Sequence, residues 1–124
     1  MAAPNILSVT SIIGKSVSSR PANTATYSIL SNAASSNRVY KINSIICSNQ
    51  NGASTVTANV FYNTAANGAG ANNALILFAS VPALSTLVVS DKTTSFYLEE
   101  NASITVSSGT SNGISFLVSY EDIA

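Results

Sequence analysis

Carboxylates are the first candidates for acid–base catalysis in this sequence. The chain has no histidine, so it lacks the usual general base, the usual partner of a catalytic nucleophile and the commonest metal ligand. A pair of carboxylates could still act as acid and base, as in glycosidases. The acidic residues fall in predicted turns or at the C-terminus: Asp91, Glu99, Glu100, Glu121 and Asp122.

Neither adjacent pair of carboxylates has the spacing of an active or metal site. Glu99 and Glu100 are neighbours on an extended stretch, so their side chains point to opposite faces. Glu121 and Asp122 lack the spaced Asp-x-Asp pattern and the glycine of a calcium loop. We therefore predict no catalytic residue, no metal site and no enzymatic activity.

Signals for cofactors, nucleic acids and membranes are also weak. Residues 67–70, NGAG, are not followed by the Lys-Ser/Thr of a phosphate-binding loop. The five basic residues are scattered, and only Arg38, Tyr40 and Lys41 combine charge with an aromatic ring. No stretch approaches the roughly 18 apolar residues of a membrane span. We predict no cofactor, no nucleic-acid partner and no membrane partner.

The single cysteine and the first residues indicate the compartment. Cys47 has no second cysteine for an internal disulfide, and its position inside a predicted strand indicates a small buried residue. The first residues, MAAPNILSV, have no basic region followed by an apolar segment, so we expect no cleaved export signal and synthesis in a cytoplasm. The sequon at residues 101–103 is then expected to form only a turn.

The scarcity of charge points to assembly. Charged residues make up 8% of the 124 residues and the formal net charge is zero, whereas an ordinary soluble domain has about 25% charged residues. Such a surface lacks the repulsion that keeps free monomers apart. This favours a protein packed against copies of itself or against a larger structure.

Two neighbouring segments are the clearest strands. Residues 38–48, RVYKINSIICS, are rich in β-branched and aromatic side chains, and residues 54–62 alternate apolar and polar side chains. Because Asn51-Gly52 lies between them, we predict that they form a hairpin at the centre of the domain.

The rest of the chain alternates short strands with turns. We predict a first strand at residues 6–13, ended by Gly14 and Lys15, and a surface connection at residues 16–23. An exposed, mobile loop is expected at residues 63–73, followed by an inner or covered strand at 74–79, with a helix as the alternative. Further strands are predicted at residues 25–29, 84–90, 95–98, 103–107 and 114–120, before a C-terminal tail.

Eight or nine short strands and no helical period predict an all-β fold. We expect one domain over residues 1–124, an antiparallel β-sandwich of the jelly-roll type, with a small closed barrel as the alternative. A sandwich could also present tyrosines as a glycan-binding platform, and the candidates are Tyr40, Tyr62, Tyr97 and Tyr120. Half-buried packing is the commoner role for tyrosine in a strand.

The chain resembles a group of small virion-associated proteins of marine tailed phages over nearly its whole length. The similarity is seen at residues 81–93, VPALSTLVVSDKT, at residues 96–104, FYLEENASI, and at the final SYEDIA. Members of that group have a YLEEGDSI-like turn, and Asn101-Ala102 stands here in place of Gly-Asp. The resemblance implies a phage structural protein located in the virion: a capsid decoration or cement protein, or a tail component.

Together, the composition and the resemblance favour a subunit that works by packing. We expect it to bind other virion proteins and to form a homo-oligomer, with a trimer as the suggested state. A tail or fibre component that binds host-surface glycans is the alternative.

Overall fold

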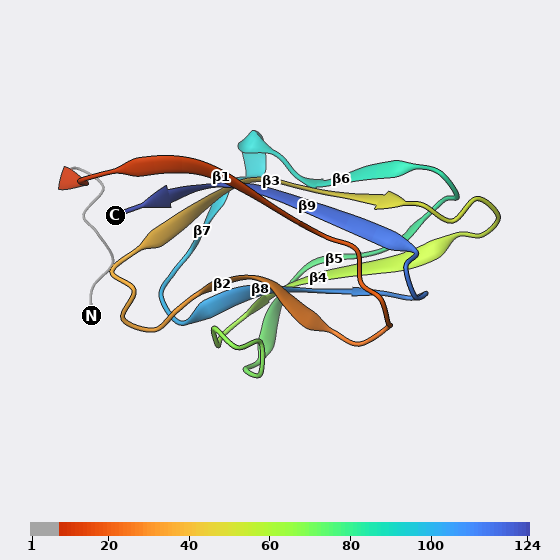
Figure 1. Cartoon of the computed structure of the whole chain (residues 1–124), viewed down its shortest axis with the longest axis horizontal. Helices are drawn as coiled ribbons and strands as arrows, with labels where there is room; N and C mark the ends of the chain where they lie inside the picture. Colours follow the sequence, from red (N-terminus) through yellow and green to blue (C-terminus); the bar gives the residue numbers. More distant parts are fainter. Residues whose placement is uncertain (1–7) are drawn as a thin grey trace.

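Two antiparallel β-sheets face each other across a hydrophobic core in the computed structural model, which describes residues 8–124 (Figure 1). Sheet A contains, in spatial order, β1 (Ile12–Ser19), β9 (Ile114–Ile123), β3 (Val39–Asn49) and β6 (Thr86–Ser90), and β7 (Phe96–Leu98) pairs with the other end of β3. Sheet B contains β2 (Tyr27–Asn32), β8 (Ala102–Ser108), β4 (Val56–Asn63) and β5 (Asn72–Val81). The predicted antiparallel sandwich is confirmed, and the barrel alternative is wrong because the sheets stay separate.

The strand order is that of a jelly roll. β6 and β7 pair with successive parts of β3 and are separated by the short η2 helix (Lys92–Thr94), so they act as one interrupted strand. The chain crosses between the sheets at each step, except at the β4–β5 connection, which stays in sheet B. This winding brings segments distant in sequence together, so that β9 lies between β1 and β3.

The prediction of a hairpin between the two clearest strands is wrong. The strands exist as β3 and β4, but β3 belongs to sheet A and β4 to sheet B. Asn49, at the end of β3, donates from Nδ2 to the carbonyl oxygens of Ser54 (2.9 Å) and Val81 (2.8 Å). The connection is thus an arch between sheets, since both strands have apolar faces that the core must bury.

The first strand lies later in the chain than predicted. β1 runs through Gly14 and Lys15, which were expected to end it, and includes residues 16–19, which were expected to be a surface connection. Residues 6–7 of the predicted strand lie outside the described residues. The partner explains the shift, because β9 pairs with all of β1 in unbroken register from Ile12–Ile123 to Ser19–Phe116.

Residues 72–81 form the edge strand β5, paired only with β4. The helix alternative is therefore wrong, and so is the prediction of an inner strand. Phe78 is largely exposed, whereas Ile76 packs against the core. The apolar residues of this run predicted burial on both faces of the strand. Because β5 lies at the edge of sheet B, the side chain of Phe78 stays exposed to solvent.

The loop after β4 is tied to the outer face of sheet B. Asn63 Nδ2 donates to the carbonyl oxygens of Gly68 (3.1 Å) and Gly70 (2.9 Å), and Ser103 Oγ donates to Ala65 O (2.7 Å). Several loop residues are exposed, as predicted, but the loop also covers β8, whose residues are buried on both faces. Its mobility stays a prediction.

A Gly70→Ala substitution is expected to disturb this loop. A Cβ atom at Gly70 would lie 2.6 Å from Thr64 Oγ1 and 2.8 Å from Ala65 N, so backbone must move. We expect a loss of about 1–3 kcal/mol in the free energy of unfolding, measured by urea denaturation. Gly52→Ala is the matched control, because nothing lies within 4 Å of its Cβ position. Equal stability of the two variants would contradict the close approach.

The C-terminal segment was expected to be a tail but is largely strand. β9 extends to Ile123, and Ala124 exchanges backbone hydrogen bonds with Ser11. Glu121 and Asp122 therefore lie on β9 within sheet A rather than in a tail, with Asp122 buried and Glu121 partly exposed. The extent of one domain over residues 1–124 stays a prediction.

Candidate functional site

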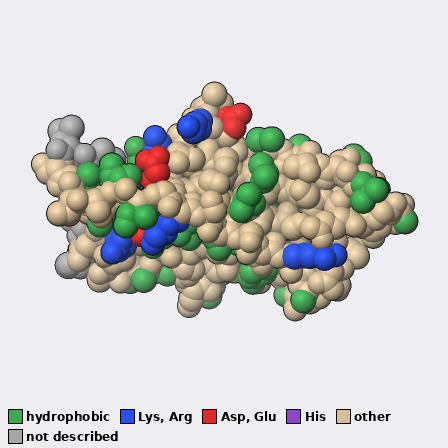
Figure 2. Space-filling view, turned by 45° about the horizontal axis from the view of Figure 1, so that its top comes forward, with side chains coloured by type: hydrophobic (Ala, Val, Ile, Leu, Met, Phe, Trp, Pro, Cys, Tyr) green, Lys and Arg blue, Asp and Glu red, His purple; other side chains and the backbone are tan. Residues whose placement is uncertain are grey.

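Three apolar side chains from neighbouring strands line up across the outer face of sheet A. Ile46 of β3 lies opposite Leu117 of β9 on one side and opposite Val88 of β6 on the other. All three are partly or largely exposed, with Val88 at 58%. We call these residues the apolar row. Figure 2 views the molecule obliquely from this side and shows hydrophobic side chains near the middle of the surface.

Neutral hydroxyl groups surround the apolar row. On one side Ser48 Oγ and Thr86 Oγ1 lie 3.0 Å apart, and on the other Ser16 Oγ and Ser119 Oγ lie 3.4 Å apart. Toward one end of this face Lys41 lies opposite Glu121. A face with neutral hydroxyl groups around an apolar centre has little charge to desolvate when another protein covers it.

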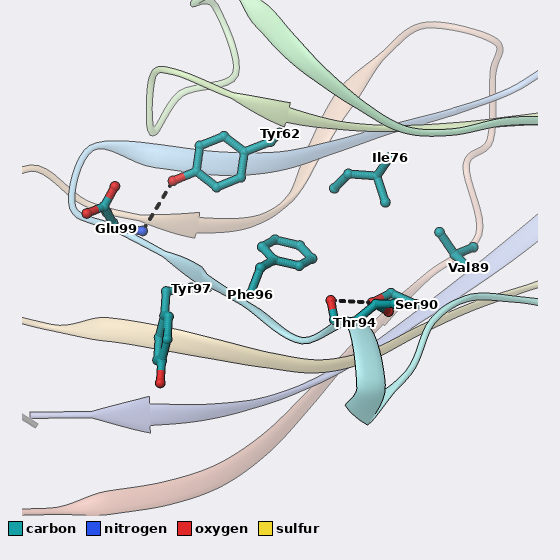
Figure 3. Close-up of a pocket in the computed structure, with 8 residues that line it drawn as sticks. All are labelled: Tyr62, Ile76, Val89, Ser90, Thr94, Phe96, Tyr97 and Glu99. Carbon is teal, nitrogen blue, oxygen red and sulfur yellow. Dashed lines mark hydrogen bonds between the residues drawn. The ribbon is translucent and has the colours of Figure 1, made fainter.

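A groove opens between the two sheets on the side of β5, β6 and β7. It has a volume of about 620 Å³ and is lined by Tyr62, Ile76, Val89, Ser90, Thr94, Phe96, Tyr97 and Glu99. Figure 3 shows Tyr62 and Ile76 entering from sheet B and facing Phe96 and Val89, while Tyr97 points away. The rings of Tyr62 and Phe96 are 6.3 Å apart in an edge-on arrangement.

The polar groups of the groove are bound to one another. Ser90 Oγ and Thr94 Oγ1 are 2.9 Å apart, and Glu99 N donates to Tyr62 Oη at 3.4 Å. Burial raises the pKa of the Tyr62 hydroxyl. Glu99 is the only carboxylate in the lining, so the groove offers apolar contact surface and no acid–base pair.

Asp122 is the buried centre of an ion-pair cluster at one end of the sandwich, and its two basic partners are partly exposed. Its carboxylate accepts hydrogen bonds from Lys15 Nζ (2.9 Å) and Arg38 Nη1 (2.8 Å), and its side chain is almost fully buried. Burial by itself raises the pKa of Asp122, but the bonds from Lys15 and Arg38 outweigh it and hold the pKa below the usual value. The cluster ties β1, β9 and the start of β3 together, which indicates a structural role.

Acid is expected to remove the contribution of this cluster to stability. Because the pKa of Asp122 is lower in the folded chain than in the unfolded chain, its contribution is present above about pH 4 and is lost as pH falls through the folded value. Urea denaturation should show a gap between the parent and Asp122→Asn at about pH 7 that narrows at about pH 3. Glu121→Gln, on the opposite face, is the control. A gap independent of pH would contradict the ion-pair role.

The other carboxylates are not brought together. Glu99 and Glu100 diverge as predicted: Glu99 lines the groove, whereas Glu100 Oε2 accepts from Asn37 N at 3.2 Å. Asp91 caps the η2 helix. The expectation that all acidic residues lie in turns or a tail is wrong for Glu121 and Asp122, because β9 continues through both residues.

The remaining candidates have mainly packing roles. Tyr40 and Tyr120 stack with ring centres 5.1 Å apart, and Tyr97 is the exposed one of the four tyrosines considered. Cys47 is fully buried, as predicted, and burial raises the pKa of its thiol to about 11. Arg38 is committed to Asp122 and therefore does not form a basic patch with Lys41.

The described part of the chain has neither a group of side chains placed to hold a metal ion nor a membrane-spanning helix. Within residues 8–124 no group of three or more histidine, cysteine or acidic side chains is placed to hold a metal ion. Over the same residues no helix is long and apolar enough to cross a membrane.

Comparison with known proteins shows similarity in fold rather than in sequence. No protein-family model matches the chain, and no curated protein matches it. A chain from the acidic stable capsid structure of Helicobacter pylori bacteriophage KHP30 aligns with a TM-score of 0.58 and 8% identity, covering 94% of this chain and 90% of the capsid chain.

The second similar structure is not viral. A chain from Bacillus endospore appendages, described as a family of disulfide-linked pili, aligns with a TM-score of 0.50 and 18% identity, covering 99% of this chain and 95% of that chain. A chain of the T13 IBDV viral particle aligns at a TM-score of only 0.36 and 8% identity, covering 94% of this chain and 32% of its own length. The similarities to the KHP30 capsid chain and to the pilus chain show the fold.

Proposed function

We propose that this chain is a non-enzymatic structural subunit of a phage virion, and specifically a capsid decoration or cement protein that acts by packing against other virion proteins. The observation that carries the proposal is the fold similarity to a phage capsid chain over nearly the whole length of both chains. The neutral outer face of sheet A, with its apolar row, supports it, because such a face suits coverage by a neighbouring protein.

A fibre subunit is the second candidate. The similarity to the pilus chain over nearly full length favours it and fits the alternative of a tail or fibre component. In this chain the folded subunit offers no accessible thiol for a disulfide between copies, because Cys47 is the only cysteine and is fully buried. Glycan binding at a fibre tip has little support, since three of the four candidate tyrosines are half-buried.

Particle binding separates the two candidates. Purified protein would be mixed with capsids of the encoding phage that lack it, then with isolated tails, and co-sedimentation measured. Binding at regular capsid positions, seen by electron cryo-microscopy, is expected. Binding to tails alone, or glycan-array binding by the free protein, would favour the fibre candidate. A trimer stays a prediction that light scattering of the free protein tests.

The apolar row is expected to contribute to capsid binding. Val88→Asp places a charge on the neutral face, and its desolvation should weaken binding by about tenfold to a hundredfold while leaving the fold intact, since Val88 is 58% exposed. Leu84→Asp is the matched control, because Leu84 is 74% exposed but lies in the turn before β6. If both variants bind like the parent in a titration, another face makes the contact.

A further inference from the structure

The outer edge of β1 is the one regular sheet edge among the described residues. A register shift interrupts the pairing of each of the other edge strands: β2 with β8, β5 with β4, and β6 with β3. In contrast, all of β1 pairs with β9 without interruption. Bulges, short lengths and charged side chains are the usual protections of edge strands against further pairing. β1 has no bulge, is 8 residues long and carries one charged side chain, Lys15.

The backbone groups on this edge can be assigned from the ladder. Ser11 and Ala124 exchange both of their backbone hydrogen bonds (3.0 Å each), so they form a hydrogen-bonded pair. Such pairs alternate along an antiparallel ladder, so Ile13, Lys15, Val17 and Ser19 bond to β9. The N–H and C=O groups of Ile12, Gly14, Ser16 and Ser18 therefore point away, toward an edge with which no strand in residues 8–124 pairs.

The side chains of β1 leave this edge apolar and nearly uncharged. Ile12 is 55% exposed and Ile13 is 49% exposed, on opposite faces of the strand. Lys15 is the only charged residue of β1, and its ammonium group is bound to Asp122. This ion pair reduces the repulsion that the ammonium group would exert on an approaching chain.

We propose that β1 pairs with β1 of a second copy of this chain, antiparallel across a two-fold axis, so that the two sheets A become one continuous sheet. The axis passes beside Lys15. Ile12 then lies opposite Ser18 of the second copy, and Gly14 opposite Ser16. This register gives every outward-pointing backbone group of the four residues a partner.

The same register explains why a second copy fits better than an unrelated strand. Ile13 lies opposite Val17 of the second copy and covers it, on the inner side of the strand. On the outer face Ile12 comes beside Ser18, the neighbour of Leu117, and so extends the apolar row of the other subunit. The two Lys15 side chains meet at the axis, where each ammonium group is bound to the Asp122 carboxylate that also binds Arg38.

This pairing would be the contact through which the homo-oligomer forms. It rests on the expectation that the chain forms a homo-oligomer and does not depend on capsid binding. A two-fold contact closes at two copies, so this contact gives a dimer, and a trimer would need a different contact. Capsid binding is measured separately and does not decide the pairing.

A proline on the outward side of β1 tests the pairing. The N–H of Ser16 points away from β9, so Ser16→Pro keeps the ladder within the subunit but removes an edge donor and blocks approach. Sedimentation equilibrium should show a dimer for the parent and at least about a hundredfold higher dissociation constant for Ser16→Pro. Ser16→Ala, which keeps the backbone donor, should dimerise like the parent.

Amide hydrogen exchange identifies the edge without any substitution. In the parent, the amides of Gly14, Ser16 and Ser18 should become protected as protein concentration rises, while Lys15 and Val17 are protected at all concentrations. Four results would overturn the proposal: a parent that stays monomeric, a trimer unaffected by Ser16→Pro, a dimer whose Gly14 and Ser18 amides exchange freely, or protection independent of concentration. The last would indicate that another part of the same chain covers the edge.

Capsid binding by monomeric Ser16→Pro would leave the proposed virion role unaffected.

Discussion

Replacing Phe116 with alanine is expected to lower the free energy of unfolding by about 3–5 kcal/mol. Phe116 is the largest fully buried side chain and points from the middle of β9 into the core, opposite Cys47 of β3. Its removal leaves a cavity between sheets whose positions are fixed by ladders on both sides of β9. Urea denaturation with a two-state fit, at a pH where the parent is fully folded, measures the loss.

Leu117→Ala is the control for this substitution. Leu117 is the next residue of the same strand, but its side chain lies on the outer face of sheet A and is partly exposed. Its truncation should cost less than about 1 kcal/mol in the free protein. A loss at Leu117 that equals the loss at Phe116 would mean that the outer face is already covered, for example within an oligomer.

The sequence predicted a strand well wherever apolar and polar side chains alternate and one face of the strand is buried. β4 and β9 alternate apolar and polar side chains, and both were placed correctly at their centres. Such a pattern is local, because each side chain only has to point toward or away from one core. The jelly-roll class followed from the number and spacing of these strands.

The errors arose where a distant partner decides the structure. β1 has a weak pattern, and its ends are set by pairing with β9, about a hundred residues later in the chain. Asn51-Gly52 is typical of a hairpin, yet β3 and β4 separate because each must present its apolar face to the other across the core. Local turn chemistry does not determine which sheet receives the next strand.

The candidate site could not be predicted for the same reason. Leu117, Ile46 and Val88 come from three strands and become neighbours only through the register of β3 with β9 and β6. Each appears as an ordinary strand residue in the sequence. The absence of histidine and the low charge did indicate the kind of surface to look for, and the neutral face of sheet A fits that indication.

Three buried asparagines at strand ends hold the connections of the sandwich. Asn32 ends β2, Asn49 ends β3 and Asn63 ends β4, and each side-chain amide donates to two backbone carbonyl oxygens. Asn32 reaches Leu98 of the opposite sheet, and Asn49 reaches Val81 of the opposite sheet. These amides donate hydrogen bonds to carbonyl oxygens at the places where the chain leaves a sheet, so those oxygens do not stay without a partner.

Asn49→Leu is therefore expected to destabilise the fold by about 2–4 kcal/mol, although leucine is the more hydrophobic residue. The substitution leaves the carbonyl oxygens of Ser54 and Val81 without their donor, and Asn51 N without the Oδ1 acceptor. The free energy of unfolding in urea measures the loss. Asn23→Ala, at an exposed asparagine whose side chain accepts only from Ala25 N, should cost about 0.5 kcal/mol.

Asn49→Asp separates the hydrogen bonds from the packing at this position. The carboxylate has nearly the same shape as the amide and still accepts from Asn51 N, but it turns an oxygen toward the carbonyl oxygens of Ser54 and Val81. Burial beside those oxygens raises the pKa of the new carboxyl in the folded chain, so the variant loses stability above the unfolded value of about 4 and regains part of it in acid. Relative to the parent, Asn49→Asp should therefore be least stable at about pH 7 and closer to the parent at about pH 3. Equal losses at both pH values would mean that Asn49 acts by filling space and not through its amide.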